Sequence, residues 1–141
     1  MTNKYFLIGF IILMSFCVHV NAQSSFGYLK IINNNPRMQT VDDSNYVIIG
    51  IFIKQSESSE WDGRDYLGGS RITRDNSTAI ALTTGLYDIR FQMQRFYVDI
   101  FAGNMSDFIT VESLNVPIRD DMITDIIMAR GRFSVSLPRR E

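Results

Sequence analysis

The stretch WDGRDYLGG, at residues 61–69, combines residue types that could form a binding site. Its two aromatic rings offer faces on which a sugar ring or an apolar ligand could stack. The charged side chains between the rings could hydrogen-bond the hydroxyl groups of such a ligand. The candidate ligand-binding residues are therefore Trp61, Asp62, Arg64, Asp65 and Tyr66.

The same stretch also has an architectural interpretation. In a β-sandwich a tryptophan that follows a long strand often fills the core, while Gly63 and the pair Gly68–Gly69 permit a bend. The aspartates would then be turn residues that bond their own backbone. A calcium ion held by Asp62 and Asp65 is a third alternative. However, calcium loops need six or more oxygen ligands, and the stretch has no alternating Asp/Asn ladder.

Paired carboxylates raise the hypothesis of a glycosidase. Such an enzyme needs two carboxyl groups about 5–10 Å apart across a cleft, one of them with a raised pKa. The pairs in this chain lie in polar loops with no apolar pocket in the pattern, which favours solvated turns. These pairs are Glu57/Glu60, Asp62/Asp65, Asp42/Asp43 and Asp120/Asp121.

The first 22 residues have the layout of a secretory signal peptide. Lys4 precedes a long apolar run, and small residues at Val20 and Ala22 predict cleavage before Gln23. The sequence therefore predicts a signal-peptide helix over 1–22, export to the periplasm, cell surface or medium, and no membrane insertion after cleavage. An uncleaved N-terminal anchor stays open as the alternative, although the apolar run is short for a membrane span.

Cleavage would remove the chain's only cysteine, Cys17, and its only histidine, His19. Without them the chain has no thiol nucleophile, no imidazole base and no disulfide. It also lacks the usual ligands of zinc, copper and haem, so we expect no catalytic residue, no metal and no cofactor. Lys and Arg number 14 against 15 Asp and Glu, and no stretch is basic enough to predict a nucleic-acid partner.

Residues 23–141 suit a single domain, and their strand signals recur between turn signals every 8–12 residues. The continuous apolar run 46–54 predicts a strand in the middle of a sheet. A helix near 118–129 is the main local alternative. The pattern predicts an all-β, antiparallel sandwich of seven to eight strands. The expected strand-forming segments are 26–32, 46–54, 77–93 (two strands joined by a turn), 95–103, 108–113, 122–129 and 132–137.

The run LTTGLYDIR, at residues 82–90, is typical of the tyrosine corner of immunoglobulin-like domains. In that corner a phenol oxygen bonds back to the backbone and fixes the crossing between two sheets. Tyr87 would take that role, and Gly85 would supply the permissive backbone before it.

Residues 46–93 resemble a group of uncharacterised exported bacterial β-sandwich domains with the pattern W-G-x-x-x-L, x-G-S and G-x-Y-D-[IL]-R. The chain departs from this pattern where Asp62 separates Trp61 from Gly63, and where Asn76 replaces the glycine before the serine. The resemblance implies an immunoglobulin-like fold outside the cytoplasm and gives structural roles to Gly63, Leu67, Gly85 and Tyr87. It implies no chemistry. The matching residues are Trp61, Gly63, Leu67, Ser77, Gly85, Tyr87, Asp88, Ile89 and Arg90.

The sequence thus predicts an exported, non-catalytic binding or interaction module of the cell envelope or extracellular space. Its partner would be a protein or a glycan. Two alternatives stay open, a small surface enzyme with paired carboxylates and a purely structural accessory protein. A deep cleft with two facing carboxyl groups would favour the enzyme, whereas an exposed patch around Trp61 and Tyr66 would favour binding.

Overall fold

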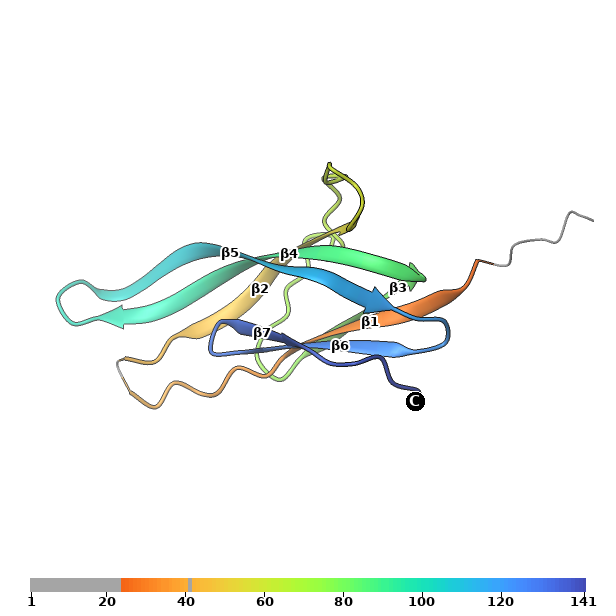
Figure 1. Cartoon of the computed structure of the whole chain (residues 1–141). Coiled ribbons are helices and arrows are strands. Elements are labelled where there is room, and N and C mark those ends of the chain that lie inside the picture. The colour runs from red at the N-terminus through yellow and green to blue at the C-terminus, as the bar shows by residue number, and fades with distance from the viewer. Residues whose placement is uncertain (1–23, 41) are drawn as a thin grey trace, which may run out of the picture.

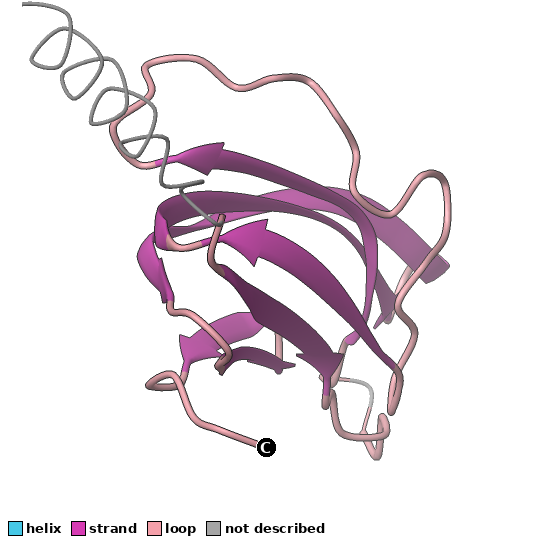
Figure 2. Cartoon of the chain, turned by 90° about the vertical axis from the view of Figure 1, so that its right-hand side faces the viewer, coloured by secondary structure: helices cyan, strands magenta, loops and turns pink. Residues whose placement is uncertain are grey.

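The computed structural model describes residues 24–40 and 42–141, so the expected signal segment 1–22 lies outside the described residues. Seven strands form two sheets, and the described part of the chain contains no helix (Figure 1, Figure 2). No segment there is a helix long and apolar enough to span a membrane. One sheet has the order β3-β1-β6-β7, from β3 (Ser77–Thr83), β1 (Phe26–Asn33), β6 (Ile123–Ala129) and β7 (Arg132–Val135). The other has the order β2-β4-β5, from β2 (Asn45–Gln55), β4 (Gly85–Asp99) and β5 (Gly103–Ile118).

The core lies between the two sheets and follows the alternation in the sequence. Along β4, Tyr87, Ile89, Phe91 and Met93 are buried, and between them Arg90 and Gln92 are more exposed. Asp88 departs from this alternation, because it is buried as well. Phe91 stacks on Phe133 with ring centroids 4.0 Å apart, which joins β4 to β7 across the layers. The fully buried apolar side chains include Leu29, Ile31, Ile48, Ile51, Ile89, Phe91, Met93, Ile126 and Met128.

Three predictions about the strands were wrong. β1 and β6 pair in parallel, so the sandwich is not wholly antiparallel. β2 is an edge strand and not a central one. Residues 95–99 continue β4, and residues 100–102 form a turn where a separate strand over 95–103 was expected. The competing helix near 118–129 does not form, because Ile123–Ala129 pairs as β6.

The hydrogen bond expected of a tyrosine corner is present. The Tyr87 hydroxyl donates to the Thr83 carbonyl at 2.9 Å and lies 2.7 Å from the Thr83 Oγ1. Thr83 ends β3 in one sheet, and Tyr87 lies near the start of β4 in the other. The bond therefore fixes the point at which the chain passes between the layers.

Two buried asparagines tie distant segments together at the end of β1. Asn33 donates from Nδ2 to the carbonyls of Tyr46 and Ile72, both at 2.9 Å. Its Oδ1 accepts from the Asn35 backbone at 3.1 Å. Asn35 in turn accepts from the Arg130 N–H at 2.8 Å. Residues 33–36 thus break the strand, as their composition suggests, but their side chains also connect both sheets.

The β4–β5 hairpin extends beyond the body of the domain. Pairing between β2 and β4 ends at Asn45 and Phe96, whereas β4 and β5 stay paired as far as Asp99 and Gly103. In Figure 1 this two-stranded extension is the teal end at the left.

Replacing Tyr87 with phenylalanine should lower the free energy of unfolding by about 1–2 kcal/mol, because the bond to Thr83 is lost while the ring still fills its place. Denaturant unfolding of purified protein measures this difference. Tyr28→Phe, at a half-exposed position in β1, is the matched control and should leave stability unchanged. Equal midpoints for parent and Tyr87→Phe would show that the corner contributes nothing.

Candidate binding surfaces

Residues 65–72 cover the free edge of β2. One carboxylate oxygen of Asp65 accepts from the Ile51 and Leu67 backbone N–H groups, each at 3.0 Å. The Tyr66 N–H donates to the Ile51 carbonyl at 2.8 Å, and Ile48 and Ile72 exchange two backbone bonds. The Asp65 side chain and the backbone of Tyr66 and Ile72 therefore take the place of a neighbouring strand at Ile48 and Ile51.

The glycines of the stretch 61–69 adopt backbone conformations that its turns require. Gly63, Gly68 and Gly69 have φ values of 74°, 57° and 86°, in the left-handed region that favours glycine. A Cβ atom at any of them would have no neighbour within 4 Å, so conformation and not space requires glycine. Asp62 accepts from the Arg64 N–H at 3.0 Å, the local bond of a turn aspartate.

Trp61 lies on the outer face of the three-stranded sheet, so the expectation that it fills the core was wrong. Its half-buried ring lies 4.2 Å from the Arg90 guanidinium and 5.5 Å from the Lys54 Nζ, measured to the ring centroid. Arg90 also donates from Nε to Glu112 at 2.8 Å. Attraction between these cations and the ring holds the tryptophan against the sheet.

The second aromatic ring has different surroundings. Tyr66 packs partly buried against the core, and the Arg64 guanidinium lies 4.7 Å from its ring centroid. Burial raises the pKa of the Tyr66 phenol, and the Asp62 charge adds to this while Arg64 opposes it. The structure therefore brings Asp62, Arg64 and Tyr66 together, whereas Trp61 contacts Arg90 and Lys54 instead. The Oδ1 of Asp65 is already engaged by backbone N–H groups.

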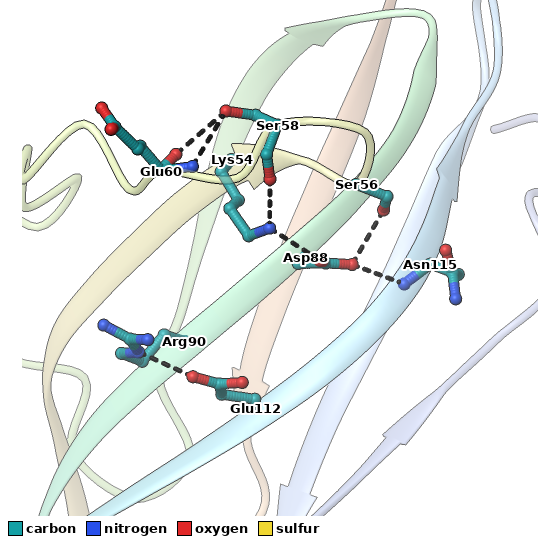
Figure 3. A network of polar contacts seen from close by, with 8 residues as sticks. All are labelled: Lys54, Ser56, Ser58, Glu60, Asp88, Arg90, Glu112 and Asn115. Carbon is teal, nitrogen blue, oxygen red and sulfur yellow. Dashed lines mark hydrogen bonds and ion pairs between the residues drawn. The ribbon is translucent and has the colours of Figure 1, made fainter.

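Asp88 is the centre of a polar network on the outer face of the same sheet (Figure 3). It accepts from the Asn115 N–H at 3.0 Å and the Ser56 hydroxyl at 2.8 Å, and it lies 3.3 Å from the Lys54 Nζ. The Asn115 bond, with Ser56 and Lys54, lowers the pKa of Asp88 against the opposing effect of burial. The network fixes the irregularity in β4–β5 pairing between Tyr87 and Ile89.

Three aspartates of the predicted carboxylate pairs, Asp43, Asp62 and Asp65, accept hydrogen bonds from backbone N–H groups close by in the sequence, as turn residues do. Asp43 accepts from the Gln39 and Thr40 N–H groups at 2.8 and 3.0 Å, and these bonds lower its pKa. Asp62 and Asp65 accept backbone bonds as described above. In residues 24–40 and 42–141 no group of three or more His, Cys, Asp or Glu side chains is placed to hold a metal ion.

The tip of the β4–β5 hairpin is an exposed apolar surface that the sequence analysis missed. Ile100 and Phe101 are 76% and 93% exposed. The Asp99 carboxylate accepts from the Ala102 and Phe101 N–H groups, both at 2.8 Å, and these bonds lower its pKa. The run DIFAG, three apolar residues between Asp and Gly, contains the turn signal, but the alternating pattern before it suggested a continuing strand.

A hollow of about 740 Å³ lies on the outer face of the four-stranded sheet. Tyr28 and Lys30 line it together with Asp121 and the C-terminal residues Arg139–Glu141. Arg139 already pairs with Asp125 at 3.0 Å. None of the five predicted ligand-binding residues lines this hollow.

No protein-family model and no curated protein sequence matches the chain. Among solved structures it is similar to listeriolysin O (TM-score 0.37, 8% identity, 82% of this chain and 22% of that chain). It is also similar to the membrane-binding domain of pneumolysin (TM-score 0.35, 14% identity, 82% and 97%) and to pneumolysin (TM-score 0.32, 12% identity, 82% and 24%). The chain thus spans less than a quarter of listeriolysin O, and at such TM-scores neither fold nor function follows from the likeness.

Asp65→Ala should destabilise the domain by about 1–3 kcal/mol, because it leaves the Ile51 N–H without its acceptor beside a buried strand. Asp62→Ala is the matched control. It removes one exposed bond and should cost well under about 1 kcal/mol. Chemical denaturation of both variants provides the comparison. Equal losses would mean that Asp65 is not the group that covers the strand edge.

Asp88→Asn should be less stable than the parent at neutral pH, since the amide keeps an oxygen acceptor but loses the charge that faces Lys54. A carboxylate with a lowered pKa stabilises the fold above its unfolded pKa and loses that contribution as pH falls through its folded pKa. The stability gap between the two proteins should therefore shrink as pH falls below the ordinary value of 3.8. Urea unfolding across that range measures the gap, and a gap independent of pH would contradict the assignment.

Proposed function

We propose that this chain is an exported, non-catalytic binding module of the cell envelope or extracellular space, and that it holds its partner with the β4–β5 hairpin tip. The exposure of Ile100 and Phe101 carries the proposal. Removing such side chains from water contributes about 25 cal/mol per Å² of apolar surface, so their exposure gives the isolated fold nothing. Their burial against a partner would be favourable.

The rigidity of the tip supports the same function. Asp99 bonds two successive backbone N–H groups, and Gly103 follows with a φ of 81°, so the turn has defined geometry before any partner arrives. Behind the tip, Arg95 donates from Nε to Asp107 at 2.9 Å across the two strands. A preorganised loop loses less conformational entropy on binding.

The chemistry of the tip favours a protein partner. Two large apolar side chains lie beside Asp99, whose pKa is lowered and which is therefore ionised at neutral pH. Burying an ionised carboxylate in hydrocarbon is costly, whereas a protein pocket can place hydrogen-bond donors at its rim. The partner we propose therefore has an apolar pocket with a polar, donor-rich rim. Aromatic anchors of this kind supply much of the binding energy in protein interfaces.

The carboxyl groups support binding over the glycosidase alternative. A glycosidase needs a general acid with a raised pKa. The pKa values of Asp43, Asp88 and Asp99 are lowered, so none of these three aspartates suits the general acid. Each of these carboxylates accepts backbone hydrogen bonds that stabilise its charged form.

Export and the immunoglobulin-like relationship are part of the same proposal. Export is supported by the signal pattern of residues 1–22. The relationship to exported β-sandwich domains is supported by the division into four and three strands and by the bond between Tyr87 and Thr83. The parallel β1–β6 pair is a departure from the usual antiparallel sheets.

The test is photocrosslinking in the native host. A benzoylphenylalanine at position 101 should give one discrete protein adduct, and the same residue at position 86 should not, although Leu86 is also exposed at the other end of β4. Unlabelled parent protein should suppress the adduct by competition, whereas unlabelled Phe101→Glu should not.

Two outcomes would overturn the proposal. The first is the absence of any adduct specific to position 101. The second is attachment to lipid together with sedimentation of the parent, but not of Phe101→Glu, on phosphatidylcholine vesicles. That second result would identify the tip as a membrane contact.

A further inference from the structure

The outer edge of β5 is a second exposed surface, separate from the hairpin tip. β5 is the last strand of its sheet and the longest, at 16 residues. Its one sheet partner in residues 24–40 and 42–141 is β4, whereas the opposite edge of the sheet is covered by residues 65–72. A long open edge offers unpaired backbone groups to another strand.

Exposed apolar side chains lie along this edge, whereas edges that are protected from pairing usually carry charged residues or proline. Phe108 and Leu114 are 74% and 62% exposed. Between residues 107 and 113 exposure alternates, with the even-numbered residues more exposed. This regular stretch ends near Asn115, which has a φ of 55° beside the irregularity in the β4–β5 register. The pairing-competent segment is therefore 108–114, which is symmetric about Val111.

We propose that a second copy of this chain pairs with β5, antiparallel, about a two-fold axis at Val111. An axis perpendicular to the sheet keeps each face on its own side, so outer residues meet outer residues. In this register Phe108 of each copy lies opposite Leu114 of the other, and Val111 lies opposite itself. Cross-strand apolar pairs of this kind stabilise a sheet.

Neighbouring registers are less favourable. Centring the axis one residue earlier places Phe108 opposite Glu112, and centring it one residue later places Glu112 opposite its own copy. The proposed register instead puts Glu112 opposite Thr110 and Asp107 opposite Asn115. Like charges directly opposite each other are destabilising, so charge and apolar matching select the same register. Glu112 is also paired with Arg90 of its own chain at 2.8 Å.

The dimer would be a continuous sheet of two β2-β4-β5 halves joined at β5. The two hairpin tips would then point in opposite directions, separated by roughly 50 Å at about 3.3 Å per residue. Such a dimer presents two copies of the tip surface at opposite ends. This inference does not depend on the proposed function, since it rests on the strand edge alone.

Sedimentation velocity of the exported protein tests the dimer. The parent should show a monomer–dimer equilibrium that follows mass action over about a hundredfold range of concentration. Phe108→Glu should raise the dissociation constant on the order of tenfold or more, because both symmetry-related Phe108–Leu114 pairs are lost. Phe101→Glu makes the same substitution at the tip, outside the pairing segment, and should dimerise like the parent. A monomer at every concentration would overturn the proposal.

Cysteine pairing tests the register. In a Cys17→Ser background, so that no other thiol is present, Phe108→Cys and Leu114→Cys are each oxidised alone and then as an equimolar mixture. Neither position faces itself in the proposed register, so the mixture should give several-fold more disulfide-linked dimer than either variant alone. Circular dichroism confirms that each variant is folded. Equal yields from the single and mixed samples would show that the strands do not pair in this way.

Discussion

The side-chain amide of Asn33 is the contact on which the rest of this fold most depends. It lies fully buried at the end of β1 and donates to carbonyls from β2 and from the segment that covers β2. Its oxygen accepts from Asn35, whose own side chain holds the β6–β7 turn through Arg130. Leaving such amide groups unpaired inside a protein costs about 1–3 kcal/mol each, so a single network specifies where four chain segments meet.

That network also positions the segment that covers the β2 edge of the three-stranded sheet. Asn33 fixes the Ile72 carbonyl, Ile72 pairs with Ile48, and Asp65 then completes the cover over β2 through Ile51. The end of the stretch 61–69, which the sequence marks as a candidate binding site, therefore covers the edge of β2. On the other side of the sheet, β4 and β5 run past the core, since the end of β2 at Asn45 leaves them no third strand.

Local sequence patterns predicted much of the fold and little of the binding surface. The strands near 26–32, 46–54 and 122–129, the inward face of β4 and the Tyr87 bond follow from period-two alternation and turn residues, which are local signals. The parallel pairing of β1 with β6 has no local signal. The long-range bonds of Asn33 and Asn35 are also absent from local patterns, because the same residues equally predict a turn. Trp61 was misplaced because its position depends on Arg90 and Lys54, which come from other strands.

The cover over β2 has a consequence for assembly. A sheet with two open edges can add strands without limit, which leads to filaments and aggregation. Here Asp65, Tyr66 and Ile72 already bond the backbone groups of Ile51 and Ile48 on the β2 edge. A strand added at β5 by a second copy would leave a covered β2 at each end of the combined sheet, so growth of this sheet would stop at two chains. In that dimer Asp65, a candidate ligand-binding residue in the sequence, would instead help to end the growth of the sheet, because its carboxylate occupies the Ile51 N–H on the β2 edge.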